Sequence, residues 1–389
     1  MRDDFLGQHY TSAEVASALS ELMGVHKPET VIDLGVGEGS LLMGANDHWS
    51  DAKLHGIDID QCSLDIARAQ LGRGTFGKAD CLAATLAPAI KELLSSADVV
   101  LCNPPFLEFA HIAARFAASQ DWRQAAEVKF FEISLQLLRP GGSLGIIFPA
   151  RYVSGPVYRE FRRQLMLTCN LVSVTHLPVS TFKTAEVDAY FIVLRKEPPN
   201  GKVLLQVLDG EGQRASTIYL NGHEAIERMD HRYHAGMSEW VANSVPLSIL
   251  LTQDISRGVE SCGRNTPDWI FHTTNFKMFP QGRIQCPPLK SALKRGLAIT
   301  GDILIPRVGS RCLHYCAQIV SGETTFSDCV YRLRVASEWR THVFNYLRSP
   351  FGIAMRSIAA HGSCVKVLGK QTLLDLPVPM MPMENLEGL

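Results

Sequence analysis

The 389-residue sequence has no apolar run of the roughly 18 residues that a membrane-spanning helix needs. Its beginning, Met1-Arg2-Asp3-Asp4, lacks the apolar segment of a secretory signal peptide. Internal repeats and low-complexity tracts are also absent. With 46% hydrophobic and 20% charged residues, a chain of this length has material for about two globular domains. We expect a cytoplasmic protein with little disorder and no membrane partner.

The ten cysteines include no Cys-x-x-Cys pair, and only Cys312 and Cys316 lie close together in the sequence. Scattered cysteines in a long chain without a secretory segment predict reduced, mostly buried thiols. We therefore expect neither disulfides nor a metal site.

The sequence also has almost no net charge, but the formal value of -1 conceals an asymmetry. Residues 1–100 contain 7 Lys+Arg and 15 Asp+Glu, a balance of -8, whereas residues 251–350 contain 13 and 7, a balance of +6. A basic C-terminal part suggests that this part contacts phosphate. Uneven but solvated surfaces would give the same numbers, and the excess is modest for a nucleic-acid-binding protein.

The most informative stretch is an apolar run, residues 98–102, that ends in Asn103-Pro104-Pro105-Phe106. Because proline fixes φ and has no amide hydrogen, the pattern predicts a buried strand with a rigid end. Ligands bind at the carboxyl ends of strands in open α/β sheets. There the Asn103 amide and the Pro104 carbonyl offer two acceptors to a planar amino group, and Phe106 offers a stacking face. A proline-stiffened turn without chemistry is the alternative.

Glycine recurs at every second position after another predicted strand, in Asp33-Leu34-Gly35-Val36-Gly37-Glu38-Gly39. Such a loop lets backbone approach a ligand closely before it turns into a helix, as nucleotide-type cofactors require. The spacing differs from the Gly-x-Gly-x-x-Gly of dinucleotide folds. A purely structural glycine turn is the alternative.

Two further strands are expected to end in acidic residues. Lys53–Asp60 places Asp58 about 20–25 residues after the glycine loop, where nucleotide-binding folds hold ribose hydroxyls. Asp60 is better explained as the N-cap of a helix over residues 63–71. Asp80 closes a third element over residues 77–82 and precedes Cys81.

These motifs resemble those of S-adenosylmethionine-dependent amino-methyltransferases, which carry Asn-Pro-Pro-aromatic after a glycine loop. The resemblance implies a catalytic set of Asn103, Pro104, Pro105 and Phe106. It also implies that the cofactor is bound by Tyr10, Thr11, Asp33, Gly35, Gly37, Gly39, Asp58, Ile59, Asp80, Cys81 and Asn103. Tyr10 and Thr11 precede a helix that begins near Ser12, which replaces the family's usual proline. Phe182 precedes an apolar strand over residues 187–195, the place where the family has a loop aromatic that stacks on the extruded base. Phe106 would stack on the same base. Ordinary packing of Phe182 against the sheet explains its position equally well.

The C-terminal part resembles target-recognition domains of restriction-modification systems. Arg228-Met229-Asp230-His231-Arg232-Tyr233 resembles the opening Arg-x-Asp-x-x-Tyr of such domains. Later matches are weak singly, but their order fits over most of residues 228–383. The basic candidates for DNA contact are Arg257, Arg264, Lys277, Arg283, Lys290, Lys294, Arg295, Arg307 and Arg311. An unrelated α+β domain is the alternative.

Together these resemblances imply a gamma-class DNA adenine-N6 methyltransferase of a restriction-modification system. The expected fold is α/β, a class I methyltransferase (Rossmann-like) domain over residues 1–196 with a seven-stranded mixed sheet. A hairpin and linker over 197–227 and an α+β target-recognition domain over 228–389 would follow. The implied partners are S-adenosyl-L-methionine, double-stranded DNA and a separately encoded endonuclease. Methylation of ribosomal RNA, methylation of a protein glutamine, and a non-catalytic DNA-binding module remain as rival functions.

Overall fold

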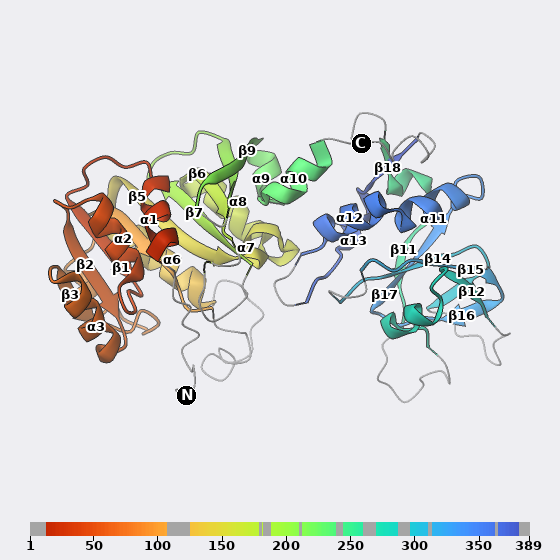
Figure 1. Ribbon diagram of the computed structural model, residues 1–389, viewed down its shortest axis with the longest axis horizontal. Coiled ribbons are helices and arrows are strands. Elements are labelled where there is room, and N and C mark those ends of the chain that lie inside the picture. Colours follow the sequence, from red (N-terminus) through yellow and green to blue (C-terminus); the bar gives the residue numbers. More distant parts are fainter. Residues whose placement is uncertain are drawn as a thin grey trace. The chain divides into compact units, whose positions relative to one another are not determined.

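The computed structural model describes residues 13–106, 125–178, 181, 188–209, 212–238, 244–259, 270–286, 296–309, 313–361 and 365–380. The chain divides into two compact units, Met1–His231 and Arg232–Leu389 (Figure 1). No helix in these ranges is long and apolar enough to cross a membrane.

Unit 1 is built on a nine-stranded sheet, counted over the described residues, with the order β3-β2-β1-β4-β5-β7-β6-β8-β9. The strands are β1 (Thr30–Leu34), β2 (Lys53–Asp58), β3 (Thr75–Lys78), β4 (Ala97–Cys102), β5 (Leu138–Pro149), β6 (Asn170–His176), β7 (Ala189–Arg195), β8 (Lys202–Leu208) and β9 (Arg214–Asn221). The neighbours from β3 to β5 pair in parallel, whereas β7 runs antiparallel between β5 and β6. This mixed α/β architecture confirms the predicted fold class.

The sheet has two strands more than the seven predicted from the sequence. The expected hairpin is present as β8 and β9, but it pairs with β6 and so extends the sheet. Val203 and Leu205 of β8 are fully buried and join the core. Apolar side chains at alternate positions of β8 therefore place the hairpin in the sheet, where it covers an edge that β6 would otherwise expose.

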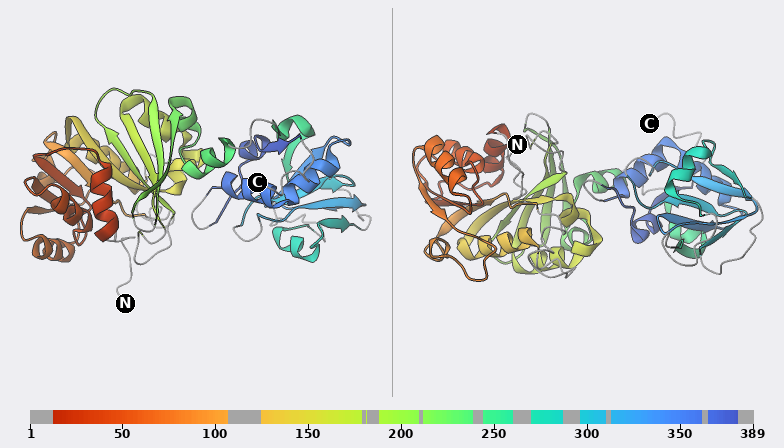
Figure 2. Two further views of the ribbon diagram at one scale, coloured as in Figure 1. Left: turned by 45° about the horizontal axis from the view of Figure 1, so that its top comes forward. Right: turned by 90° about the horizontal axis from the view of Figure 1, so that it is seen from below.

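Helices cover both faces of this sheet (Figure 2). They are α1 (Ala13–Leu22), α2 (Ser40–His48), α3 (Gln61–Leu71), α4 (Pro88–Lys91), α6 (Ala126–Leu137), α7 (Ala150–Ser154), η2 (Pro156–Tyr158), α8 (Arg159–Thr168) and α9 (Gly222–Glu227). Val15 and Leu19 of α1 pack with α2 on one face, whereas α6 and α8 pack on the other. The apolar faces of the amphipathic helices α1 and α6 thus pack on opposite sides of one sheet.

The last residues of unit 1 are held firmly to α8. The guanidinium of Arg162 is 1% exposed and donates to the carbonyls of Ile226 and Glu227 at 2.8 and 2.7 Å, as well as to those of Tyr152 and Gly155. Met229 follows, fully buried, with its amide bonded to the Val153 carbonyl. The Arg228–Asp230 pair of the Arg-x-Asp-x-x-Tyr motif is buried in the same place.

Unit 2 contains a five-stranded sheet with the order β11-β17-β14-β15-β12 and two two-stranded sheets, β10-β18 and β13-β16, within the described residues. Its strands are β10 (Ser244–Pro246), β11 (Leu251–Arg257), β12 (Arg283–Gln285), β13 (Leu297–Ile299), β14 (Ile303–Pro306), β15 (Ala317–Ser321), β16 (Glu323–Thr325), β17 (Val330–Val335) and β18 (Pro377–Pro379). Its helices are α10 (His231–Ser238), which starts at the boundary, η5 (Leu247–Leu250), η6 (Thr273–Met278), α11 (Arg340–Arg348), α12 (Pro350–Ala359) and α13 (Lys370–Leu374).

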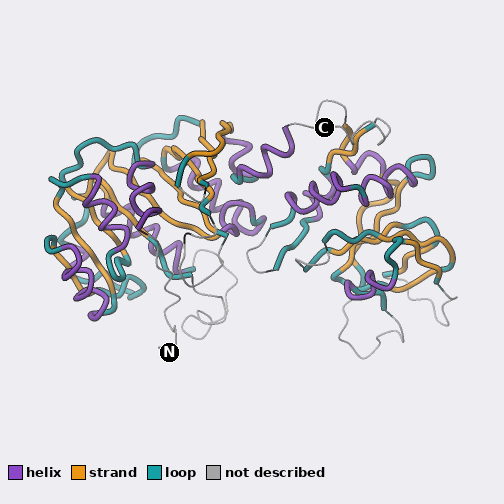
Figure 3. Tube along the Cα trace, in the orientation of Figure 1, coloured by secondary structure: helices purple, strands orange, loops and turns teal. Residues whose placement is uncertain are grey.

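The two faces of the central sheet of unit 2 bury different cores. Tyr331 and Leu333 of β17 pack with Phe344 and Met355 of α11 and α12, the two helices that run beside the strands in Figure 3. Phe326 belongs to a second, aromatic cluster on the other side. Alternation along β17 therefore leaves its remaining side chains facing away from the helices.

Candidate active site

The predicted site residues converge where four neighbouring parallel strands end. Asp33 and the glycine loop lie at the end of β1, Asp58 at the end of β2, Asp80 just after β3, and Asn103 directly after β4. In the pairing of β1 with β4, Leu34 is opposite Cys102, so Gly35 and Asn103 emerge side by side. Adjacent strands lie about 4.8 Å apart, so the whole set spans about 15 Å of one edge.

The glycine loop has a conformation that other residues would strain. Gly35, Gly37 and Gly39 have φ angles of 81°, 52° and 94°, in the left-handed region that side chains disfavour. A Cβ at Gly35 would lie 3.2 Å from Cε1 of Phe130 and 3.7 Å from the carbonyl oxygen of Asn103. The loop therefore needs glycine for its left-handed turn, and at Gly35 also for the close packing of the Phe130 ring from α6.

Asp58 holds this loop through one carboxylate oxygen and the turn from β2 into α3 through the other. Oδ2 accepts from the amide of Gly37 at 2.8 Å, and Oδ1 accepts from the amide of Asp60 at 2.9 Å. Asp58 is 5% exposed. A carboxylate has about four lone-pair directions, so two bonds leave acceptor capacity for a ligand hydroxyl. Asp58 thus shapes the loop and retains acceptor capacity for the ribose hydroxyls that the sequence predicts as its ligand.

Asp60 acts as the N-cap of α3, as predicted. Its carboxylate accepts from the amides of Cys62 and Ser63 at 3.2 and 3.3 Å and from the Ser63 hydroxyl at 2.8 Å. These bonds satisfy amide groups that the first helical turn leaves without partners.

Asp33 is the most buried acid of the site. It is 1% exposed, and its Oδ1 atom has no hydrogen-bond partner among the described residues. Burial, reinforced by the nearby charge of Asp58, raises the pKa of the Asp33 carboxyl well above its ordinary value. A positively charged ligand would compensate both carboxylates. The sulfonium and ammonium charges of S-adenosylmethionine, the cofactor expected from the sequence, would fit these two acidic acceptors and the glycine loop beside them.

The third strand adds Asp80 and Cys81. Oδ1 of Asp80 accepts from the Leu82 amide at 2.8 Å, which orients the half-buried carboxylate. Burial raises the pKa of the Cys81 thiol to about 12, and that of Cys102 is raised as well. Both thiols are therefore protonated at neutral pH and are poor nucleophiles. Ile59, between Asp58 and Asp60, is 36% exposed.

The Asn-Pro-Pro-Phe segment follows β4 directly. Asn103 and Pro105 are half-buried, and Pro104 is buried. Phe106 is half-buried and packs against the core that β1 and β4 share with α1 and α2. Tyr10, Thr11 and Phe182 lie outside the described residues.

Two side chains of α6, Glu127 and Phe130, lie near the site and were not predicted from the sequence. Glu127 and Phe130 are buried with Val128 and Phe131, whereas Leu135 is only half-buried. Phe130 lines Gly35. Its place directly before Phe131 widens the apolar stripe of the helix, a signal that could have identified it.

Glu127 is completely buried beside the end of β5. It accepts from the guanidinium of Arg151 and, at 3.2 Å, from the hydroxyl of Tyr152. Burial raises the pKa of Glu127 although the charge of Arg151 opposes the shift. The sequence carries no signal for this pairing, because a glutamate in the first turn of a helix is ordinary on a solvated surface.

Comparisons with known proteins relate this chain to methyltransferases that act on nucleic acids. Residues 3–239 match the sequence profile of the family N-6 DNA Methylase. The chain is 24% identical over 227 residues to the type II restriction enzyme and methyltransferase RM.BcgI of Heyndrickxia coagulans. This alignment covers 53% of this chain and 34% of that protein. It is 33% identical over 125 residues to the ribosomal RNA large subunit methyltransferase G of Shewanella amazonensis, which covers 30% and 28%.

Among solved structures, a modification subunit of a putative type I restriction enzyme from Vibrio vulnificus aligns with a TM-score of 0.43 and 18% identity over 65% of this chain and 58% of that one. This chain spans about a third or less of the length of the curated relatives named above. The family match, by contrast, covers more than half of the chain and includes every residue predicted for cofactor binding and catalysis. The chain belongs to the N-6 DNA Methylase family.

Proposed function

We propose that this chain transfers a methyl group from S-adenosylmethionine to the N6 amino group of an adenine flipped out of duplex DNA. The observation that carries the proposal is the position of Asn103 and Pro104 at the carboxyl end of β4, beside the glycine loop of β1. Acceptors for an amino group thus stand next to the cradle for a cationic cofactor. The family membership supports the same reaction.

The proposed cofactor site consists of the ends of β1, β2 and β3. Asp33 would compensate the positive charge of the cofactor, the Gly35–Gly39 loop would let the cofactor approach the backbone closely, and Asp58 would accept from its ribose hydroxyls. Asp80, Cys81 and Ile59 would surround the adenine ring. The cofactor, when bound, supplies the electrophilic methyl group.

Chemistry at the target amine rests on Asn103 and Pro104. An exocyclic amine is a poor nucleophile because its lone pair is delocalised into the ring. The Asn103 amide oxygen and the Pro104 carbonyl would accept its two hydrogens, localise the lone pair and aim it at the methyl group. No covalent enzyme intermediate is needed, in keeping with the protonated state of the Cys81 and Cys102 thiols.

The flipped base needs compensation for the stacking and pairing it loses, about a few kcal/mol. Phe106, at the end of the acceptor segment, and Phe182, in the loop before β7, are the proposed stacking partners, with Pro105 stiffening the turn.

Unit 2 is the proposed target-recognition domain, and the chain the modification component of a restriction-modification system with a separately encoded endonuclease. Four of the basic candidates lie among the described residues, and three of these, Arg257, Lys277 and Arg283, are exposed. Arg307 is engaged with Asp328, and Arg283 bonds Gln318 and lies over Phe344. Arg257 and Lys277 extend from exposed positions. The other candidates, Arg264, Lys290, Lys294, Arg295 and Arg311, lie outside the described residues.

Ribosomal RNA is the second candidate substrate, because the chain is also similar to a ribosomal RNA methyltransferase over 125 residues. The same acceptor segment would serve either nucleic acid. Unit 2 favours DNA through its resemblance to target-recognition domains.

The test is methyl transfer by the full chain, with N6-methyladenine measured by mass spectrometry after incubation with plasmid DNA or ribosomal RNA. Asn103→Ala should abolish transfer while S-adenosylmethionine affinity stays within a few-fold. The matched control is Asn200→Ala, which removes the same side chain at an exposed turn where Asn200 accepts from the Lys202 amide. Transfer to RNA with none to DNA would select the second candidate. Loss of cofactor binding with residual turnover would reverse the role given to Asn103.

A further inference from the structure

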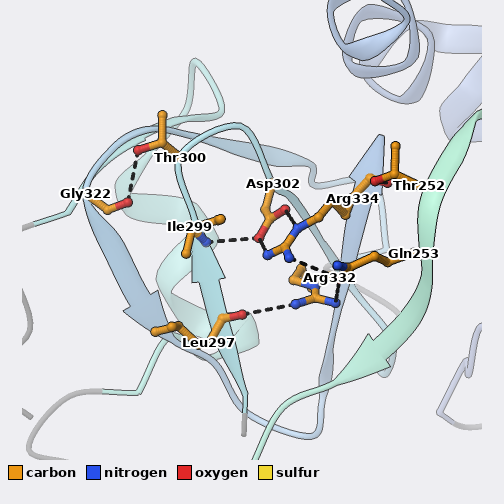
Figure 4. A network of polar contacts seen from close by, with 9 residues as sticks. All are labelled: Thr252, Gln253, Leu297, Ile299, Thr300, Asp302, Gly322, Arg332 and Arg334. Atoms are coloured by element: carbon orange, nitrogen blue, oxygen red, sulfur yellow. Dashed lines mark hydrogen bonds and ion pairs between the residues drawn. The ribbon is translucent and has the colours of Figure 1, made fainter. Parts of the chain in front are cut away.

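Two arginines of unit 2 lie on the face of β17 that turns away from α11 and α12. Tyr331, Leu333 and Val335 are buried against those helices, so Arg332 and Arg334 point to the other side. Figure 4 shows their guanidinium groups next to each other, between Asp302 and Gln253.

Arg334 is firmly paired. Its Nε and Nη2 atoms donate to the two oxygens of Asp302 at 2.8 and 2.7 Å, and Nη1 donates to Oε1 of Gln253 at 3.0 Å. Asp302, 2% exposed, also accepts from the Ile299 amide at 2.9 Å. The single acidic side chain of this group is thereby used by Arg334 and the backbone.

Arg332 receives no such compensation. It donates to the Leu297 carbonyl at 3.3 Å and to Oε1 of Gln253, already bonded to Arg334, at 3.2 Å. Its buried Nε atom has no hydrogen-bond partner among the described residues. A guanidinium has five N–H donors, so these contacts occupy only two, both at long distance. Burial and the charge of Arg334 lower the pKa of Arg332, and Asp302 offsets this only in part.

A third guanidinium, that of Arg340 at the start of α11, packs against the turn that carries Asp302. Cζ of Arg340 would be 2.6 Å from a Cβ at Gly301, and Nε of Arg340 also lacks a partner within the described residues. Arg334 is thus the arginine that pairs with Asp302, with Arg332 bonded to the same Gln253 and Arg340 packed against the neighbouring Gly301. The group reaches solvent, because Gln253 is exposed and the Arg334 side chain is 24% exposed.

We propose that Arg332 and Arg334, with Gln253 at the opening, bind a backbone phosphate of DNA. This inference rests on the proposed function, since it takes the anion to be part of duplex DNA. A phosphate brings several acceptor oxygens in a geometry that guanidinium groups match, and it supplies the negative charge that the group lacks. Phosphate contacts position a protein on DNA without reading its sequence.

The sharpest test places an anion in the opening. Gln253→Glu is nearly isosteric at an exposed residue and puts a carboxylate between the two guanidiniums. It should raise the melting temperature, because it relieves the repulsion between Arg332 and Arg334. It should also weaken binding of the full chain to a labelled duplex of mixed sequence by about 5- to 10-fold at moderate salt and lower the slope of log K against log salt by about 0.9, the loss of one phosphate contact.

Matched variants separate a local site from general charge. Gln285→Glu makes the same change at an exposed position of β12, at the other edge of the sheet, and should leave the salt slope unchanged. Arg332→Gln should lower the slope as Gln253→Glu does. Gln253→Glu that raises the melting temperature but leaves DNA affinity and salt slope at wild-type values would overturn the proposal and make the group a structural link between β11, β13 and β17. A wild-type chain that methylates RNA and binds duplex DNA without salt dependence would refute the proposed function instead.

Discussion

Replacing Asp58 with alanine tests the dual role that its contacts indicate. The substitution removes both oxygens that accept from the Gly37 and Asp60 amides at 2.8 and 2.9 Å. It should therefore disturb the glycine loop before any cofactor is added, and it should also remove the proposed partner of the ribose.

The expected loss of stability can be worked out from these two bonds. A hydrogen bond to a charged group contributes about 1.5–3 kcal/mol, so two give about 3–6 kcal/mol. Water reaches the freed amides and recovers part of this, so we expect about 3 kcal/mol. A domain of about 200 residues loses about 2–4 °C in melting temperature per kcal/mol, which gives a decrease of about 6–12 °C.

The assays are thermal unfolding without ligand and calorimetric titration with S-adenosylmethionine. Asp60→Ala is the control, because it removes the same side chain two residues away and costs only the N-cap of α3, about 1 kcal/mol. It should melt about 2–4 °C below wild type and bind the cofactor within about threefold of it. Asp58→Ala should bind at least tenfold more weakly.

Two results would refute this reasoning in different ways. An Asp58→Ala protein that has the melting temperature of wild type but fails to bind cofactor would show that the loop keeps its conformation without the carboxylate. One that melts early yet binds cofactor like wild type would make Asp58 a loop residue only.

Three other changes have opposite or separable effects. Asp33→Asn should raise the melting temperature by about 2–4 °C at pH 8 and by less near pH 4. Folding raises the pKa of this carboxyl, so its charge destabilises the fold increasingly as pH rises above the unfolded pKa of about 3.9. Calorimetry should show weaker cofactor binding, and a lower melting temperature at pH 8 would contradict the burial argument. Arg162→Met should lower the free energy of unfolding by more than about 3 kcal/mol, because it leaves four backbone carbonyls without their donor. Accordingly, a chain ending at His231 should stay soluble and bind cofactor, whereas one ending at residue 225 should not. Phe182→Ala should slow methylation and reduce 2-aminopurine fluorescence at the target, with Phe182→Trp retaining much of both; a drop in melting temperature with unchanged activity per folded molecule would show packing instead.

The sequence predicted the succession of strands along the chain and the acidic residues at their ends, because both follow from local patterns. Apolar runs ended by Asp, Gly or Pro mark β1, β2 and β4, and such strand ends meet at one edge of a parallel sheet. The pairing of the β8–β9 hairpin could not be predicted, since which strand edge a hairpin covers depends on tertiary packing. The same holds for Glu127 and for the Arg332–Arg334 group, whose burial is set by neighbours far along the chain.

Methylation of DNA adenines by this chain can be measured by mapping methylated adenines across the genome of cells that express the full chain. The account predicts N6-methyladenine at one recurring DNA sequence with wild type and none above background with Asn103→Ala. Adenine methylation confined to RNA, or genomic DNA without new N6-methyladenine while the purified protein is folded and binds S-adenosylmethionine, would contradict it.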